Sequence, residues 1–282
     1  MSEKVNKIVT DKIIEHLDQG KIPWQKPWRS KSERPKNAAT GRRYRGINAL
    51  ICSVSGYTDS NWFTLKQLGN LGLELKEDQK YTPIVFWNWI EKKKEGGPLE
   101  RIPFTKFYKC FNRQQVKGAE ALWPKEDTKP DEEWEANADI LIKSYQERGG
   151  PKIEHGMSQA SYSPSKDMVK MPSRADFISP EEYWSATFHE MTHSTGHESR
   201  LKRTEGMKTV FGDHGYSKEE LVAEVGSCFL MADFGVEKHI KNSAAYIQGW
   251  LEVLKGDRKI LMQAAQQAEK SCDYIRGESY NG

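Results

Sequence analysis

Two histidines and a glutamate with the spacing of a metal site are the clearest chemical feature of this chain. Residues 189–193 read His-Glu-Met-Thr-His. Side chains four residues apart share one face of a helix, so His189 and His193 can present both imidazoles to one metal ion. Glu190 lies beside them, where a carboxylate can accept a proton from a water on the metal. The spacing therefore predicts a metal centre of the hydrolase type.

The residues before the motif predict the helix that positions it. Ser179 is a good N-cap, Pro180 suits the first helical position, and Glu182 stands at the third position. Apolar residues then recur at helical spacing, and Gly196 is a suitable residue to end the helix. The alternative is an amphipathic surface helix whose two histidines are simply solvated.

A catalytic zinc needs a third protein ligand and an open position for water. The metzincin pattern would place a third histidine at position 199, where this chain has Ser199. His197 could serve only if the helix continued through Gly196, so we expect His197 to be a surface group or a neighbour of the site.

A later helix, expected over residues 217–231, offers the missing carboxylate. We expect Glu220 to be the third ligand and Glu224, one turn further on, to orient a histidine ring. The alternative is that Ser217 and Glu220 form a capping box, which would leave Glu224 as the ligand. Zn²⁺ is the expected ion for two histidines and a carboxylate, with Mn²⁺ or Co²⁺ as alternatives.

Length and composition indicate a two-domain protein without a membrane segment. A chain of 282 residues exceeds one average domain. The sequence has no apolar run long enough to span a bilayer and no signal peptide at its polar N-terminus, so we expect no membrane partner. Its four cysteines show no CxxC pair, which favours free thiols and a cytoplasmic location.

Charge divides the chain into two unlike halves. Residues 1–125 carry 24 Lys and Arg against 13 Asp and Glu, whereas residues 126–282 carry 19 against 27. An acidic, proline-bearing stretch follows Pro124, and we expect a linker over residues 126–132. A basic half joined to an acidic half indicates a nucleic-acid-binding module beside a module of another kind.

The basic half also holds six of the nine tryptophans. Aromatic rings among Lys and Arg suit single-stranded nucleic acid, because rings stack on unpaired bases while cations contact phosphates. We expect Trp62, Trp87 and Trp89 to be core residues instead. A solvated basic loop is the alternative for residues 42–45. The expected DNA contacts are Trp24, Trp28, Lys36, Arg42, Arg43, Tyr44, Arg45 and Asn48.

These motifs resemble the ArdC-type antirestriction proteins of conjugative plasmids and phages along nearly the full chain. The N-terminal likeness rests on Pro23-Trp24, Pro27-Trp28, Thr40-Gly41-Arg42, residues 44–50 (Tyr-Arg-Gly-Ile-Asn-Ala-Leu) and Phe111-Asn112. The C-terminal likeness rests on Tyr162-Ser163-Pro164, Asp167, Met171-Pro172, the HEMTH box with Ser194 to Gly196, and residues 219–224 (Glu-Glu-Leu-Val-Ala-Glu). Residues 74–81 depart from the family pattern, because they are charged and lack an expected glycine.

The resemblance implies several properties. Such proteins bind single-stranded DNA non-specifically through the N-terminal domain, carry a zincin-like domain with a divalent metal, and help mobile DNA escape host restriction. On this chain the metal residues would be His189, His193 and Glu220, with Glu190 as the candidate base. Tyr162 would lie on an edge strand beside the cleft, where it could touch a substrate.

We therefore expect an α+β protein of two domains. Residues 1–125 would form a mixed domain with an amphipathic helix over 4–18 and a small antiparallel sheet, including strands at 81–89 and 104–111. Residues 133–282 would form the zincin-like domain, with a helix at 133–148, strands at 152–171, the two ligand helices and a final helix over 243–270.

Two functional hypotheses follow from this sequence. In the first, the metal site and Glu190 hydrolyse a host or plasmid protein or peptide. In the second, which we favour, DNA binding performs the antirestriction role, and the metal site is accessory. Single-stranded DNA is the expected partner and double-stranded DNA a secondary one. The sequence contains no zinc finger and no basic region with heptads, so it does not support sequence-specific DNA binding.

Overall fold

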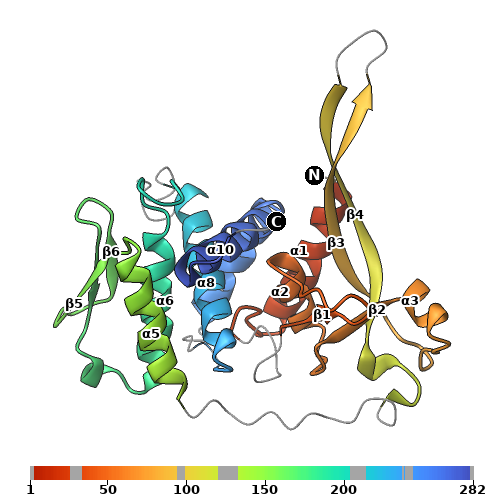
Figure 1. Cartoon of the computed structure of the whole chain (residues 1–282), viewed down its shortest axis with the longest axis horizontal. Helices are drawn as coiled ribbons and strands as arrows, with labels where there is room; N and C mark the ends of the chain where they lie inside the picture. Colours follow the sequence, from red (N-terminus) through yellow and green to blue (C-terminus); the bar gives the residue numbers. More distant parts are fainter. Residues whose placement is uncertain are drawn as a thin grey trace.

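The computed structural model describes residues 3–25, 34–93, 99–119, 133–203, 214–236, 238 and 244–279. They form an α+β protein with two parts, each with its own sheet (Figure 1). The expected linker at 126–132 and the tryptophan at position 28 lie outside the described residues. None of the helices in these ranges has the length and apolar character that crossing a membrane requires.

In its described ranges, the N-terminal part contains a four-stranded sheet and the helices α1 (Glu3–Asp18), α2 (Ile47–Val54) and α3 (Leu65–Asn70). The strands are β1 (Lys36–Asn37), β2 (Asn61–Thr64), β3 (Thr82–Lys93) and β4 (Leu99–Asn112), in the order β1-β2-β4-β3. A short 3-10 turn follows β4 at Arg113–Gln115. The predicted helix at 4–18 is therefore confirmed, because α1 buries its apolar stripe of Val5, Val9, Ile13 and Leu17.

A long β-hairpin rises from this sheet beyond the body of the molecule (Figure 1). Its strands β3 and β4 pair antiparallel from Thr82 opposite Cys110 to Lys93 opposite Leu99. The predicted strands at 81–89 and 104–111 are confirmed, and both are longer in the structure than the sequence indicated. Only the lower part of the hairpin lies against the body.

The C-terminal part combines a three-stranded sheet with five described helices. The strands β5 (Lys152–His155), β6 (Ser161–Ser163) and β7 (Met168–Met171) lie in the order β5-β7-β6. The helices are α5 (Trp134–Glu147), α6 (Pro180–Ser194), α8 (His214–Asp233), α9 (Ala244–Gly256) and α10 (Ile260–Arg276), with a 3-10 turn at Arg174–Asp176.

The expected single helix over 243–270 was wrong, because the structure has two helices there, α9 and α10. The break follows Gly256. The Asp257 side chain accepts a hydrogen bond from the Lys259 backbone N–H at 2.8 Å, which competes with helix continuation. The apolar periodicity on both sides of the break resembles one helix, and only the local Gly-Asp pair marks the interruption.

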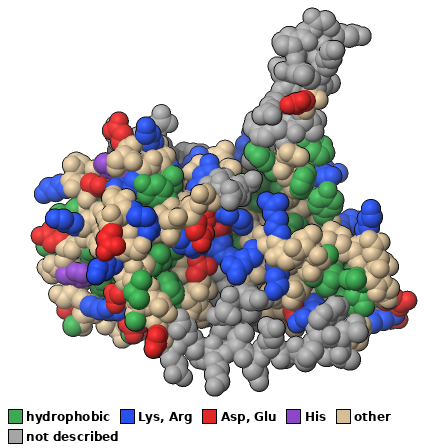
Figure 2. All heavy atoms as spheres, viewed as in Figure 1, with side chains coloured by type: hydrophobic (Ala, Val, Ile, Leu, Met, Phe, Trp, Pro, Cys, Tyr) green, Lys and Arg blue, Asp and Glu red, His purple; other side chains and the backbone are tan. Residues whose placement is uncertain are grey.

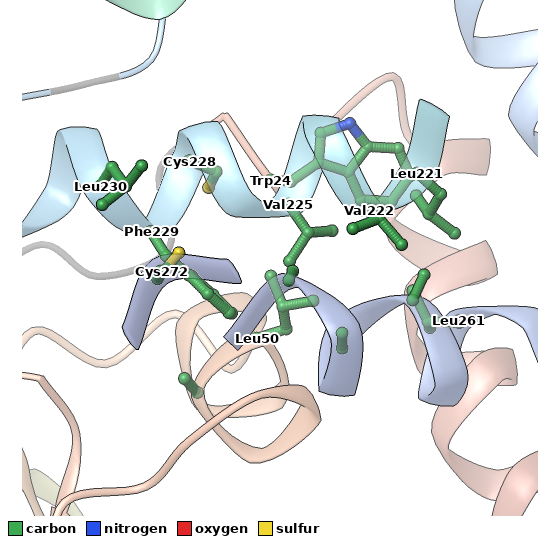
Figure 3. Close-up of a cluster of buried hydrophobic side chains, with 14 of the residues drawn as sticks. Trp24, Leu50, Leu221, Val222, Val225, Cys228, Phe229, Leu230, Leu261 and Cys272 are labelled. Atoms are coloured by element: carbon green, nitrogen blue, oxygen red, sulfur yellow. The ribbon is translucent and has the colours of Figure 1, made fainter. Parts of the chain in front are cut away.

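One hydrophobic core joins the two parts. Trp24 and Leu50 from the N-terminal part pack with Leu221 and Val225 of α8 and Leu261 of α10 (Figure 3). Between Leu221 and Ala232, helix α8 is buried on nearly all sides, which explains the apolar character of that stretch. All four cysteines are free and buried. The N-terminal part thus covers the helix that carries the expected third ligand.

A buried polar cluster fixes the same contact. Glu269 of α10 is 2% exposed, accepts a hydrogen bond from the Gly46 backbone N–H at 2.9 Å, and pairs with Arg34 at 2.5 Å. Gly46 has φ of 51°, and a Cβ there would meet the Ala265 carbonyl oxygen at 3.2 Å. The start of α2 therefore lies directly against α10, and glycine is needed for both reasons.

Candidate metal centre and nucleic-acid surface

Helix α6 holds the two histidines on one face. Its first turn begins as the sequence predicted, since the Ser179 hydroxyl accepts a hydrogen bond from the Glu182 N–H and Pro180 opens the helix. The helix ends at Ser194, so His197 lies past its end, hydrogen-bonded to Ser199. The Nε2 atoms of His189 and His193 lie 3.1 Å apart.

Helix α8 brings the carboxylate to this pair. The Oε2 atom of Glu220 lies 3.5 Å from the His189 Nε2, and Oε1 lies 3.4 Å from the His193 Nε2. Ligand atoms about 2.0–2.2 Å from one tetrahedral ion are separated from each other by about 3.3–3.6 Å. The three side chains therefore fit a shared cation. Among the described residues, they form the group of His, Cys, Asp and Glu side chains whose ligand atoms lie close enough together to hold a metal ion.

The capping-box alternative for Glu220 was wrong. The helix α8 already includes His214, so Ser217 lies within the helix and does not occupy its N-cap. Glu220 is then one turn inside the described helix, with its carboxylate directed at both imidazoles.

A close helix contact sets the distance between the ligand helices. A Cβ on Gly226 of α8 would meet the Thr192 Cγ2 at 2.6 Å and its Oγ1 at 2.8 Å. The Ser227 hydroxyl also donates a hydrogen bond to the Ser185 carbonyl at 2.8 Å. The absence of a side chain at position 226 lets α8 approach α6 closely, which brings Glu220 within reach of the histidines.

The sequence did not lead us to expect the carboxylate that contacts His193 at Nδ1, the ring nitrogen that does not face Glu220. The Oε1 atom of Glu219 lies 3.4 Å from the His193 Nδ1, and Glu219 is 5% exposed. Arg203 donates to both oxygens of Glu219, at 3.0 and 2.9 Å. A metal-binding histidine commonly has such a partner, which fixes its ring and tautomer. The adjacent Glu219 and Glu220 were a signal for this role, whereas nothing local identified Arg203.

The pKa values of the cluster indicate that it stabilises a positive charge. Burial by itself lowers the pKa of His193, but hydrogen bonds to Glu219 and Glu220 outweigh it and raise that pKa to about 10. Burial raises the pKa of Glu220, yet its contacts with both histidines hold that pKa well below its usual range. The pKa of Glu219 is likewise lowered despite burial, through His193 and Arg203. Two imidazole nitrogens facing one carboxylate need a positive charge between them.

Glu224 is paired with a lysine. Its carboxylate contacts Lys238, which is 3% exposed and also donates to the Glu224 backbone carbonyl at 3.0 Å. The charge of Glu224 also acts on His189, so its expected role in orienting a histidine ring stays a prediction, whereas Glu219 contacts His193 directly. Glu190 is part-exposed beside the ligands, which leaves its expected role as a base a prediction.

A polar cluster engages Tyr162, and its expected contact with a substrate stays a prediction. Its hydroxyl donates to the Asp167 carboxylate at 2.7 Å and accepts from Arg200 at 3.1 Å. Burial and Asp167 raise the pKa of this phenol. The strand β6 is an edge strand, as the resemblance implied, but this polar cluster occupies the hydroxyl.

The structure separates the expected DNA contacts into buried and exposed groups. Trp24 is fully buried and donates to the Tyr246 hydroxyl at 2.9 Å, so its expected stacking role was wrong. Asn48 uses both ends of its amide on the Val85 backbone, at 2.8 Å each. These side chains stabilise the fold and are not available to bases.

Two further expected contacts are also engaged inside the protein. Tyr44 packs against a buried cluster and its hydroxyl faces the Cys110 sulfur, so burial raises its pKa. Arg45 pairs with Asp273 of α10. Arg42 and Arg43 are exposed and Lys36 is partly exposed, so these three cations remain predicted DNA contacts.

The tryptophans expected in the core behave differently from one another. Trp62 is 1% exposed, as expected, but Trp87 on the hairpin is 44% exposed, so that expectation was wrong. The hairpin extends beyond the core at this point, which the alternation of apolar residues could not show. The side chain of Trp89 lies outside the described residues.

Each of the two parts of the chain matches a known protein family. The N-terminal domain of the anti-restriction factor ArdC matches residues 3–134, and the zincin-like metallopeptidase family matches residues 140–267. The chain is also 34% and 35% identical to two Escherichia coli proteins named DNA primase TraC, over 96% and 95% of its length. It spans only 20% and 26% of those proteins.

Solved structures extend the likeness to the whole chain. The metal-free crystal structure of the antirestriction ArdC protein from the R388 plasmid is 33% identical, covers 96% of both chains and superposes with a TM-score of 0.78. The Mn(II)-bound structure of that protein gives a TM-score of 0.76 over 98% of both chains.

Proposed function

Because this chain belongs to the ArdC family of antirestriction proteins, we propose that it protects incoming DNA by binding single strands non-specifically. The main observation behind this proposal is that Arg42 and Arg43 are exposed together on one turn. Arg43 also lines a cavity of about 640 Å³ at the junction of the two parts, where Arg34, Arg45 and Arg276 are paired with acidic residues of the same lining. Cations exposed on a turn, as Arg42 and Arg43 are, suit phosphates of any sequence.

The relatives support a role on DNA. Two of them are named DNA primases, and a third is named an antirestriction protein. Partners of this chain are therefore expected among DNA strands, with double strands as the weaker ligand because their base faces are already stacked.

The metal centre is proposed to hold one divalent ion on His189, His193 and Glu220. The donor set suits Zn²⁺, and the Mn(II)-bound relative makes Mn²⁺ an equal candidate. Glu219, supported by Arg203, would hold the His193 ring in the orientation that directs its Nε2 to the ion.

Protection in cells tests which part performs the antirestriction role. Unmodified DNA transferred into a restricting host should survive as well with His189→Ala as with the original chain, provided that the variant folds. Arg42→Ala/Arg43→Ala should protect less. Equal protection by the arginine variant together with loss in His189→Ala would overturn the proposal.

A second candidate function is metal-dependent peptide hydrolysis. The observation that favours it is Glu190, which lies between the two ligands in sequence, is part-exposed, and acts electrostatically on His193. A bound ion would polarise a peptide carbonyl and acidify water, and Glu190 would accept a proton and return it to the leaving amine. Cleavage of a protein substrate should then disappear in Glu190→Gln while bound metal stays unchanged. A Glu190→Gln variant that cleaves at the original rate would exclude this function.

A further inference from the structure

One face of the lower hairpin collects aromatic side chains around a lysine. Side chains alternate between the two faces of a strand. The register pairs Phe86 with Lys106, Asn88 with Phe104 and Ile84 with Tyr108, so these residues share one face. We call Phe86, Phe104, Lys106 and Tyr108 the hairpin patch.

The hairpin patch is exposed to an unusual degree for such large rings. Phe86 and Phe104 are each 38% exposed, and Tyr108 is 40% exposed. The Lys106 ammonium lies 4.7 Å from the centre of the Tyr108 ring, 5.3 Å from that of Phe86 and 5.9 Å from that of Phe104. Figure 2 shows hydrophobic side chains on the described part of the hairpin nearest the body, with Lys and Arg side chains beside them.

The opposite face of the hairpin anchors it to the body. Val85 is 9% exposed and belongs to the shared core, and Phe107 packs against that core. Asn48 of α2 holds the Val85 backbone through two hydrogen bonds. The hairpin patch therefore lies on a fixed strand pair, next to Ile84 of the same face, which is buried with Trp62, and its three rings are each more than a third exposed.

Charge decides what kind of molecule suits the hairpin patch. Residues 82–88 and 104–110 include Lys106 and Lys109 and no acidic residue. Lys109 also lies 5.0 Å from the centre of the Tyr81 ring. A partner must therefore bring flat apolar surfaces together with negative charge. Unpaired bases on a phosphate backbone supply both, whereas a duplex keeps the faces of its bases stacked inside.

We propose that the hairpin patch is a stacking platform on which unpaired bases of single-stranded DNA lie against Phe86, Phe104 and Tyr108 while Lys106 turns to a phosphate. This inference rests on the proposed function and adds a second surface to the exposed basic turn. Arg42 and Arg43 would contact the backbone, and the hairpin patch would select single strands over double strands.

Leucine substitutions in the full chain separate stacking from folding. Phe86→Leu/Tyr108→Leu keeps apolar side chains on the strands but removes two rings. Binding of a fluorescent oligothymidylate of about 20 nucleotides should weaken about tenfold or more, because each stacked base contributes a factor of about five or greater. The dependence of affinity on salt should stay unchanged, because no charge is lost.

Lys106→Met provides the complementary readout. Its affinity should fall, and the slope of log affinity against log salt should become shallower by about 0.7, the value for one phosphate contact on a single strand. Trp87→Leu on the opposite face and Leu71→Ala, which is 55% exposed on the α3 side of the same part, are the controls that should bind as tightly as the original chain.

The outcomes separate this inference from the proposed function. If the original chain binds the oligonucleotide and the double leucine variant binds equally well, the stacking platform is excluded and the proposed function stands. Equal losses in Trp87→Leu and the double variant would also exclude it, because the effect would not belong to one face. If the original chain does not bind at all, the proposed function itself fails. Circular dichroism and melting temperature check that every variant is folded.

Discussion

At the scale of residues, the metal centre depends on more than its three expected ligands. His189, His193 and Glu220 converge at separations that suit one ion. Behind them, Glu219 and Arg203 form a buried ion pair that fixes the His193 ring. The metal affinity should therefore depend on a residue that never touches the metal.

Glu219→Gln tests that dependence. The variant keeps the size of the side chain but removes the charge that His193 and Arg203 share. Metal affinity, measured by competition with a coloured chelator, should weaken about 10–100-fold, the usual effect of losing a ligand's hydrogen-bond partner. Glu190→Gln is the control and should bind metal as the original chain does. A Glu219→Gln variant with unchanged affinity would show that the ring needs no such support.

The residue pattern predicted part of this site and missed the rest for a physical reason. The spacing of His189 and His193 follows from helix periodicity, which is local, and Glu220 was expected because a zinc site needs a third ligand and a later helix offers carboxylates. The contacts of Glu219, Lys238 and Arg203 arise between segments distant in sequence, and periodicity carries no information about them. For the same reason Trp24 was expected at a DNA surface, although it is buried against Tyr246.

At the scale of elements, the contact between α6 and α8 controls the site. Gly226 and Thr192 are the point of closest approach, and Thr192 is fully buried with its hydroxyl bonded to the Phe188 carbonyl. A methyl group at position 226 therefore cannot be accommodated by a simple rotation of Thr192.

Gly226→Ala should destabilise the protein by about 1–3 kcal/mol, as overpacking of a core does. It should also weaken metal binding, because the added methyl pushes α8 and Glu220 away from α6. Thr192→Ala removes the two nearest atoms and leaves the Thr192 Cβ at 3.3 Å, so the double variant should recover part of both losses. Thermal unfolding and chelator competition, measured for both single variants and the double variant, give the coupling between the two positions. Additive losses would show that this contact does not set the helix distance.

Most elements were predictable, and the exceptions are instructive. Apolar periodicity and the Ser179-Pro180 start predicted α1 and α6 nearly to the residue. The break between α9 and α10 was not predicted, because Asp257 competes for the backbone at one position only. The length of the hairpin was underestimated, since residues 91–93 and 100–101 are all charged and show no alternation in the sequence.

At the scale of the whole molecule, the two parts are not independent. The division of charge predicted two separate modules, and the family matches do divide the chain near residues 134–140. Nevertheless Trp24 and Leu50 lie in one core with α8 and α10, and Glu269 pairs with Arg34 across the junction. Charge patterns describe the surface, whereas this junction is buried.

The shared core predicts a single cooperative unfolding transition. Trp24→Ala should lower the free energy of unfolding of the entire chain by about 3–5 kcal/mol, because it removes a fully buried ring. Calorimetry should show one transition at a lower temperature, not a separate early loss of the N-terminal part. Ile178→Ala, at a side chain that is 91% exposed, is the control and should unfold as the original chain does. Two separate transitions in the original chain would contradict a common core.

The most direct test of the proposed function is the affinity of the intact chain for unpaired DNA. Fluorescence anisotropy should compare one labelled single strand with its duplex, in the presence and absence of a chelator and over a range of salt concentrations. We predict tighter binding to the single strand, no effect of the chelator on it, and log affinity that falls by about 0.7 per neutralised phosphate for each tenfold rise in salt. Binding that prefers the duplex, or that ignores salt, would contradict the account.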